Sequence, residues 1–336
     1  MPLYSIGDLA SSFILRRQNL RLNQDLARLS QELASGTAAD IPRHLDGNYA
    51  YLGDIERGLR VNEGFATAAK EAAFVTGAMQ TALDRVQHTT TKLSADLVMA
   101  GKTSLPEVTE TASNAARGEL GALLSALNTN VAGRALFSGI ATDALSFASA
   151  DTFIADLKIA VAGEVTLGGI LTAIDDWFNL PGGGFETVGY LGSDTDLPPF
   201  LVGEGETVDL DLRGDSQIVR DMLKHTTIAA LASDPDLAYP SYLQGELLVA
   251  AGEGMMTAQD ELAQIRADLG YAEARIEENR TRLSTESTGL EMARGELLGV
   301  DLYDTATRLE NVQFQLEALY TATARLSGLS LVEYLR

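Results

Sequence analysis

Three histidines are the side chains of this 336-residue chain best suited to acid–base catalysis or metal binding. His44, His88 and His225 are far apart in the sequence, and none has a second histidine at the short spacing of a metal site. The chain contains no cysteine, which excludes thiolate nucleophiles, disulfides and cysteine-ligated metals. We therefore expect surface or loop histidines, no catalytic residue, no metal and no cofactor, and we predict that the chain is not an enzyme.

Two further patterns have a chemical and a structural interpretation. A glycine run at residues 182–184 is followed by Phe185 and Glu186, whereas a phosphate-binding P-loop requires a lysine and a serine or threonine there. The acidic tracts at residues 193–196 and 209–211 could offer oxygen ligands to calcium, but they lack the spacing of a twelve-residue calcium loop. We expect the glycine run to be an ordinary loop, the first acidic tract to be a solvated turn and the second to be the outer face of a strand.

The composition argues against two classes of partner. The net charge is −22, and the longest basic run is Arg16-Arg17. Because phosphate groups bind clustered lysine and arginine, we expect neither nucleic acid nor an anionic membrane as a partner. No stretch of 18 apolar residues predicts a membrane span, and the first 20 residues lack the apolar core of a secretory signal. If the protein leaves the cell, we expect a route without a cleavable signal peptide.

Apolar residues have a regular helical spacing at both ends of the chain. Near the C-terminus they recur at alternating steps of four and three, which is typical of a coiled coil, and near the N-terminus leucines repeat every seven residues. The predicted subunit-interface residues are Leu15, Leu22, Leu26, Leu29, Leu33, Leu302, Leu309, Val312, Leu316, Leu319 and Leu326. A lone helix of this length is marginal in water. Burial contributes about 0.8 kcal/mol per CH₂ only when the two seams meet each other or neighbouring subunits.

The segments between the terminal seams predict long helices with an insertion. We expect a first helix over about residues 7–33 that stops at Ser35-Gly36, and further helices over about 49–100, 106–136 and 243–300. Gly299 and Asp301 mark a joint before a separate terminal helix. The intervening stretch is rich in Gly, Asp and Thr, with a short helix expected at 153–178 and a strand at 207–212.

The predicted fold class is mainly α, with an inserted α/β domain and a long antiparallel helical bundle built from the N- and C-terminal segments. Residues 1–40 and 301–336 are the predicted terminal coiled-coil domain. Residues 41–137 and 241–300 are the predicted long-helix core, and residues 138–240 are the predicted mixed α/β insertion.

Both ends of the chain resemble the bacterial flagellin superfamily. The segment Leu29-Ser30-Gln31-Glu32-Leu33-Ala34-Ser35-Gly36 resembles the end of that family's N-terminal helix. The segment from Asp301-Leu302-Tyr303-Asp304 to Ser327-Gly328-Leu329-Ser330-Leu331 is similar to its C-terminal helix. Residues 37–43 depart from the family pattern, so contacts of that loop are not carried over.

Internal segments resemble the hook-associated protein 3 branch of the superfamily, which forms the hook–filament junction. Gly133-Arg134-Ala135-Leu136-Phe137-Ser138-Gly139 resembles the exit from its second long helix. Residues 190–194, 202–208 and 212–215 resemble its Tyr-x-Gly-Asp, Gly-x-Gly-x-x-Val and Gly-Asp segments.

The resemblance implies a structural subunit of the bacterial flagellum, located outside the cell. Paired terminal helices would line an inner tube, the long helices would surround it, and the insertion would project outwards. The implied partners are further copies in a ring or tube, a neighbouring hook-associated protein, flagellin, the flagellar type III export apparatus and an export chaperone. A filament-forming flagellin is the alternative, and a secreted helical adhesin or effector is a more distant one.

Overall fold

The computed structural model describes residues 6–103 and 105–334, with side chains placed for residues 12–103 and 105–325. It is mainly helical, which confirms the predicted fold class. The helices are α1 (Ile6–Ser35), α2 (Ile41–His44), α3 (Ala50–Gly101), α4 (Pro106–Leu127), α5 (Ala150–Ala160), α6 (Leu167–Asn179), α7 (Gln217–Leu231), α8 (Ser241–Leu298) and α9 (Leu302–Tyr334). The strands are β1 (Asn130–Val131), β2 (Arg134–Ala135), β3 (Phe200–Gly203) and β4 (Glu206–Val208), and a π-helical turn, η1, spans Phe185–Gly189. No described helix is long and apolar enough to cross a membrane.

The chain divides into two compact units. Unit 1 contains residues 1–63 and 285–336, and unit 2 contains residues 64–284. Helices α3 and α8 contribute to both. The three-part division predicted from the sequence stays a prediction.

The joints of unit 1 follow from local backbone chemistry. Helix α1 ends before Gly36, whose φ of +70° is a left-handed conformation that glycine adopts without strain. Helix α9 begins after Asp301, whose carboxylate accepts hydrogen bonds from the backbone amides of Tyr303 and Asp304 at 2.8 and 3.1 Å. These two caps separate α1 and α9 from the helices next to them in sequence.

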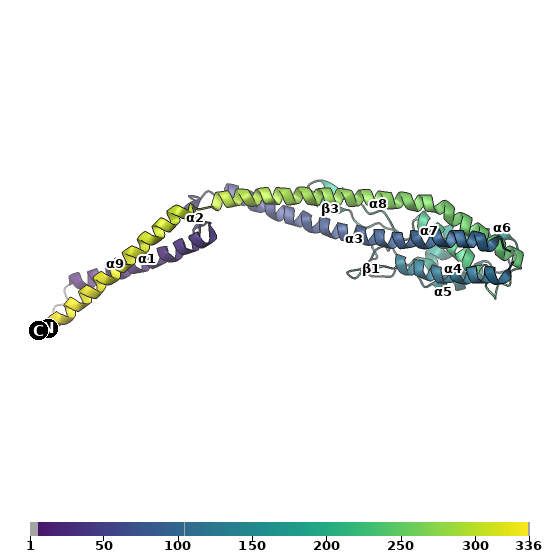
Figure 1. Ribbon diagram of the computed structural model, residues 1–336, viewed down its shortest axis with the longest axis horizontal. Coiled ribbons are helices and arrows are strands. Elements are labelled where there is room, and N and C mark those ends of the chain that lie inside the picture. The colour runs from purple at the N-terminus through teal and green to yellow at the C-terminus, as the bar shows by residue number, and fades with distance from the viewer. Residues whose placement is uncertain (1–5, 104, 335–336) are drawn as a thin grey trace. The chain divides into compact units, whose positions relative to one another are not determined.

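Helices α1 and α9 pack side by side in unit 1 (Figure 1). The loop after α1 is tied to the joint between α8 and α9 by two backbone hydrogen bonds, from the Ala38 amide to the Leu298 carbonyl at 2.8 Å and from the Val300 amide to the Gly36 carbonyl at 3.1 Å. Since Leu22 in the middle of α1 contacts Leu316 and Leu319 further along α9, the two helices run antiparallel.

Unit 2 is organised around one hydrophobic core that includes parts of the predicted insertion. Ile218, Met222 and Leu223 of α7 are buried together with Leu83 of α3 and Leu262 of α8. Helix α7 also packs along α4, as Figure 1 shows for the same unit. Within unit 2, the stretch between residues 138 and 240 therefore shares its core with the long helices.

Two local predictions in this stretch need correction. The single helix expected at residues 153–178 is two helices, α5 and α6, separated by a turn in which Gly163 has a φ of +89°. The strand expected at 207–212 pairs only as far as Val208, in the β3–β4 hairpin. Beyond it Leu210 is buried while Asp209 and Asp211 are exposed, so the alternation of side chains continues without a hydrogen-bonded ladder.

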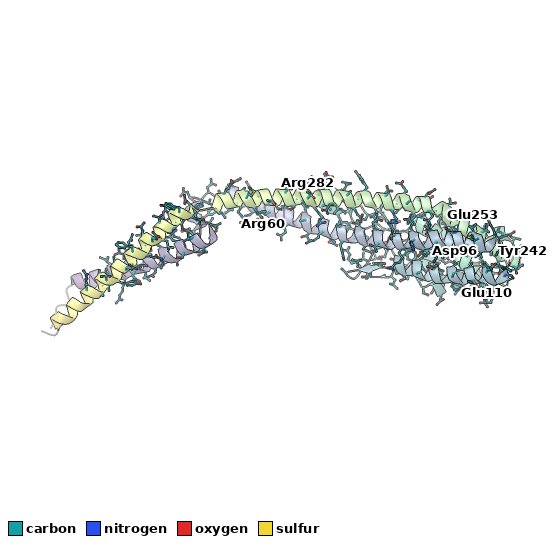
Figure 2. The ribbon with its side chains drawn as sticks, viewed as in Figure 1. Arg60, Asp96, Glu110, Tyr242, Glu253 and Arg282 are labelled. Carbon is teal, nitrogen blue, oxygen red and sulfur yellow. The ribbon has the colours of Figure 1, made fainter. Side chains whose placement is uncertain are left out.

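The acidic character of the chain is visible on the exterior of unit 2. Asp96, Glu110 and Glu253 come from three different helices and lie exposed to solvent (Figure 2).

Candidate assembly interface

The two terminal seams meet each other within one chain. Leu22 of α1 is buried against Leu316 and Leu319 of α9. The partly buried Leu15, Leu26 and Val312 flank this cluster. The seam leucines therefore cover one another in the isolated chain, which is one of the two arrangements that the sequence left open.

The remaining predicted interface residues lie along or beside this seam. Leu29 is buried, Leu309 is partly buried, and Leu33 and Leu302 are exposed. The side chain of Leu326 lies outside the described residues. A role of these leucines in contacts between subunits stays a prediction.

An ion-pair cluster holds the last turns of α1. Arg28 donates to Glu32 at 3.0 and 3.1 Å and to Asp25 at 3.2 Å, and the Ala39 amide donates to Glu32 at 3.3 Å. Burial lowers the pKa of Arg28, but the hydrogen bonds to Asp25 and Glu32 outweigh burial and leave the pKa raised. Because Glu32 is buried and also binds the loop after α1, the cluster fixes the chain where it leaves the helix.

Exposed apolar side chains lie on the opposite face of both helices. Phe13 and Leu20 of α1 are 68% and 65% exposed, and Phe314 of α9 is 71% exposed. The sequence reasoning missed them, because charged residues separate them and interrupt the apolar repeat. The signal that could have found them is their helical spacing relative to the seam, which places them about half a turn away from it.

Unit 2 brings together the internal segments on which the resemblance rests. The Gly214 amide donates to the Phe137 carbonyl at 2.8 Å, and the Ser193 amide donates to the Ser138 carbonyl at 2.9 Å. The Tyr190 hydroxyl lies 3.1 Å from the carbonyl of Phe137. At Gly214 a Cβ atom would come within 2.6 Å of the Phe147 ring, so only glycine fits that close approach. Three segments separated by up to 80 residues thus form one hydrogen-bonded block.

The three histidines lie on different elements. His44 lies in unit 1 with its Nε2 atom 3.1 Å from the Leu297 carbonyl, whereas His88 and His225 belong to α3 and α7 of unit 2. Among the described residues, no group of three or more His, Asp or Glu side chains could hold a metal ion.

The glycine run and the first acidic tract both make contacts that stabilise the fold of unit 2. Gly184 packs so closely against the Trp177 ring that a Cβ atom would overlap with it. In the first acidic tract, Asp196 pairs with Arg213. The glycine run is thus a site of close packing, and the acidic turn is bound by an arginine.

The C-terminal helices match a known family. Residues 253–335 match the model of the bacterial flagellin C-terminal helical region. These residues include most of α8, the joint and nearly all of α9, and α9 carries half of the terminal seam. The C-terminal part of the chain is therefore similar to flagellin. This similarity was the expectation from the sequence, and the match confirms it for this part.

The chain was also compared with solved structures and with curated protein sequences. A solved structure of a putative flagellar hook-associated protein from Vibrio parahaemolyticus is similar, with 13% sequence identity and a TM-score of 0.41, over 71% of this chain and 95% of that chain. No curated protein sequence matches the chain significantly. The similarity to a known family accordingly rests on residues 253–335.

Proposed function

We propose that this chain is a structural, non-enzymatic subunit of the bacterial flagellum that assembles at the hook–filament junction through its terminal helices. The observation that carries the proposal is the flagellin region at residues 253–335, together with the pairing of its helix α9 with α1. Because α9 uses one face to bind α1, its opposite face is left for neighbouring molecules.

The junction is favoured over the filament by the internal segments. The segments around Tyr190 and Gly214 both make hydrogen bonds with the segment around Phe137, and all three resemble the hook-associated branch. The proposed partners are further copies of the chain in a ring or tube, a neighbouring hook-associated protein and flagellin.

The proposal includes export and location. An unfolded chain without cysteine passes a narrow export channel without disulfides to reduce, which suits the flagellar type III apparatus. Before assembly the exposed apolar side chains of the terminal helices need a cover, and a dedicated chaperone would supply it. The assembled subunit is extracellular.

Electron microscopy of a strain that lacks the gene tests this function. A junction subunit predicts hooks without filaments, with flagellin released into the medium. A filament-forming flagellin, the alternative, predicts that purified filaments of the unaltered strain contain the chain along their whole length. Normal flagella and normal swimming in the deletion strain would refute both and favour a secreted adhesin or effector.

A further inference from the structure

The outward face of α1, on the side opposite the seam, combines apolar and basic side chains. Phe13, Arg17 and Leu20 follow one another at steps of four and three residues, so they share one face of the helix, and all three are exposed. Arg16 and Arg21 lie exposed beside them. This face thus offers two apolar contacts within a cluster of three guanidinium groups.

The outward face of α9 has the same spacing with the opposite charge. Glu310, Phe314 and Glu317 also follow at steps of four and three and are exposed, which places an aromatic ring between two carboxylates. In both helices the buried leucines lie on the other side.

The charges on both faces are unpaired within the part of the chain whose side chains are described. Neither Arg17 nor Arg21 of α1 has an ion pair there, and neither Glu310 nor Glu317 of α9 has one, although other exposed charges in α9 do, such as Arg308 with Asp304. Exposed aromatic rings and arginines are enriched at protein–protein contacts.

The two faces cannot meet within one molecule. Helices α1 and α9 contact each other through the seam, so the faces opposite the seam point away from each other. Any contact between the basic face and the acidic face therefore joins two molecules. Such a contact uses a different surface on each partner, and it can be repeated from copy to copy around a ring or along a helical series.

We propose that the outward face of α1, formed by Phe13, Arg17, Leu20 and Arg21, docks on the outward face of α9, formed by Glu310, Phe314 and Glu317, of a second copy of this chain. The inference rests on the proposed function and specifies which surfaces carry it. Phe13 and Leu20 cover Phe314, while the guanidinium groups meet the carboxylates at the rim. The opposite charges fix which helix binds which and suppress contacts between identical faces.

Charge reversal tests the inference in a strain that lacks the native gene. One variant carries Arg17→Glu with Arg21→Glu, and the second carries Glu310→Arg with Glu317→Arg. Each variant alone places like charges opposite each other, so we expect incorporation into flagella to fall by at least about tenfold. Producing both variants together restores attraction at every contact between unlike copies, and one chain with all four changes restores it at every contact. Incorporation should recover in both cases.

Three controls separate the possible causes of a loss. Glu110→Arg with Glu253→Arg changes the same number of exposed charges in unit 2 and should leave incorporation unchanged. The amount of each variant in the culture medium reports export, and circular dichroism of the purified chains reports folding. Normal incorporation of either reversed pair, or no recovery when the two are combined, would overturn the inference. Absence of the unaltered chain from flagella would instead overturn the proposed function.

Cross-linking gives a readout that does not depend on charge. Because the chain has no cysteine, Arg17→Cys in one tagged copy and Phe314→Cys in another introduce the only thiols. Oxidation of assembled protein should join the two differently tagged copies. Predominant links between two copies of the Arg17→Cys chain would show that identical faces meet, and would contradict the proposed pairing.

Discussion

Truncation of Leu316 in the α1–α9 seam is expected to loosen both terminal helices in the isolated chain. Leu316 is 6% exposed and packs with Leu22 and Leu319. The change Leu316→Ala removes three carbon atoms, which at about 0.8 kcal/mol per CH₂ costs about 2 kcal/mol. This value lies at the low end of the range for leucine-to-alanine changes, because a small cluster between two helices can collapse onto the space left.

Hydrogen exchange followed by mass spectrometry measures this loss directly. A cost of about 2 kcal/mol predicts about 30-fold faster exchange of the protected amides in peptides from both α1 and α9. The matched control is Phe314→Ala, which lies on the same helix but on the exposed face, and should leave exchange in the monomer unchanged. Unchanged exchange in Leu316→Ala, or equal acceleration in both variants, would show that the seam does not hold α1 to α9.

Three further changes test caps, close packing and pH dependence. Asp301→Ala removes the cap of α9 and should destabilise that helix by about 1 kcal/mol, seen as faster exchange in its first turn. Gly245→Ala should lower the thermal midpoint of unfolding, because its Cβ would lie 2.7 Å from a backbone carbonyl of α3, whereas Gly118→Ala in open space should raise it. Burial and then the neighbouring lysine lower the pKa of His225 to about 4, below its unfolded value of about 6.5. Protonation thus favours the unfolded chain, and the free energy of unfolding should fall by up to roughly 3 kcal/mol from pH 6.5 to pH 4. The variant His225→Gln should flatten this pH dependence. The control His88→Gln, at an exposed histidine, should leave it in place.

Helix boundaries of the terminal segments were predictable because single residues determine them. Gly36 supplies a left-handed residue after α1, and Asp301 supplies a side chain that accepts the first free amides of α9. The leucine repeats likewise predicted that α1 and α9 each present one apolar face. These signals are local, so a single sequence contains them in full.

The architecture of unit 2 was harder to predict because it depends on contacts between distant segments. Helix α7 lies in a stretch whose glycine and aspartate content suggested an irregular insertion, yet its Ile218 and Met222 complete the core shared with α3 and α8. The division of residues 150–179 into α5 and α6 depends on a turn at Gly163 within an apolar pattern that continues across it.

Half of the candidate interface could be found from the sequence. The seam leucines stand out as a regular repeat, and the structure shows that Leu22, Leu316 and Leu319 bury one another within a chain. The outward face was missed because it mixes Phe13 and Leu20 with arginines, and Phe314 with glutamates, so hydropathy alone gives no stripe. The protein must stay soluble before it assembles, so a surface that binds a neighbour mixes charged with apolar residues. Such a surface has no apolar periodicity.

Immunogold labelling of this chain on isolated flagella tests the central claim most directly. A junction subunit that assembles through its terminal helices predicts gold particles confined to a short band between hook and filament. Removing the exposed ring with Phe314→Ala should reduce that label while the protein is still exported. Flagella without label, in cells that produce and export the unaltered chain, would contradict the account.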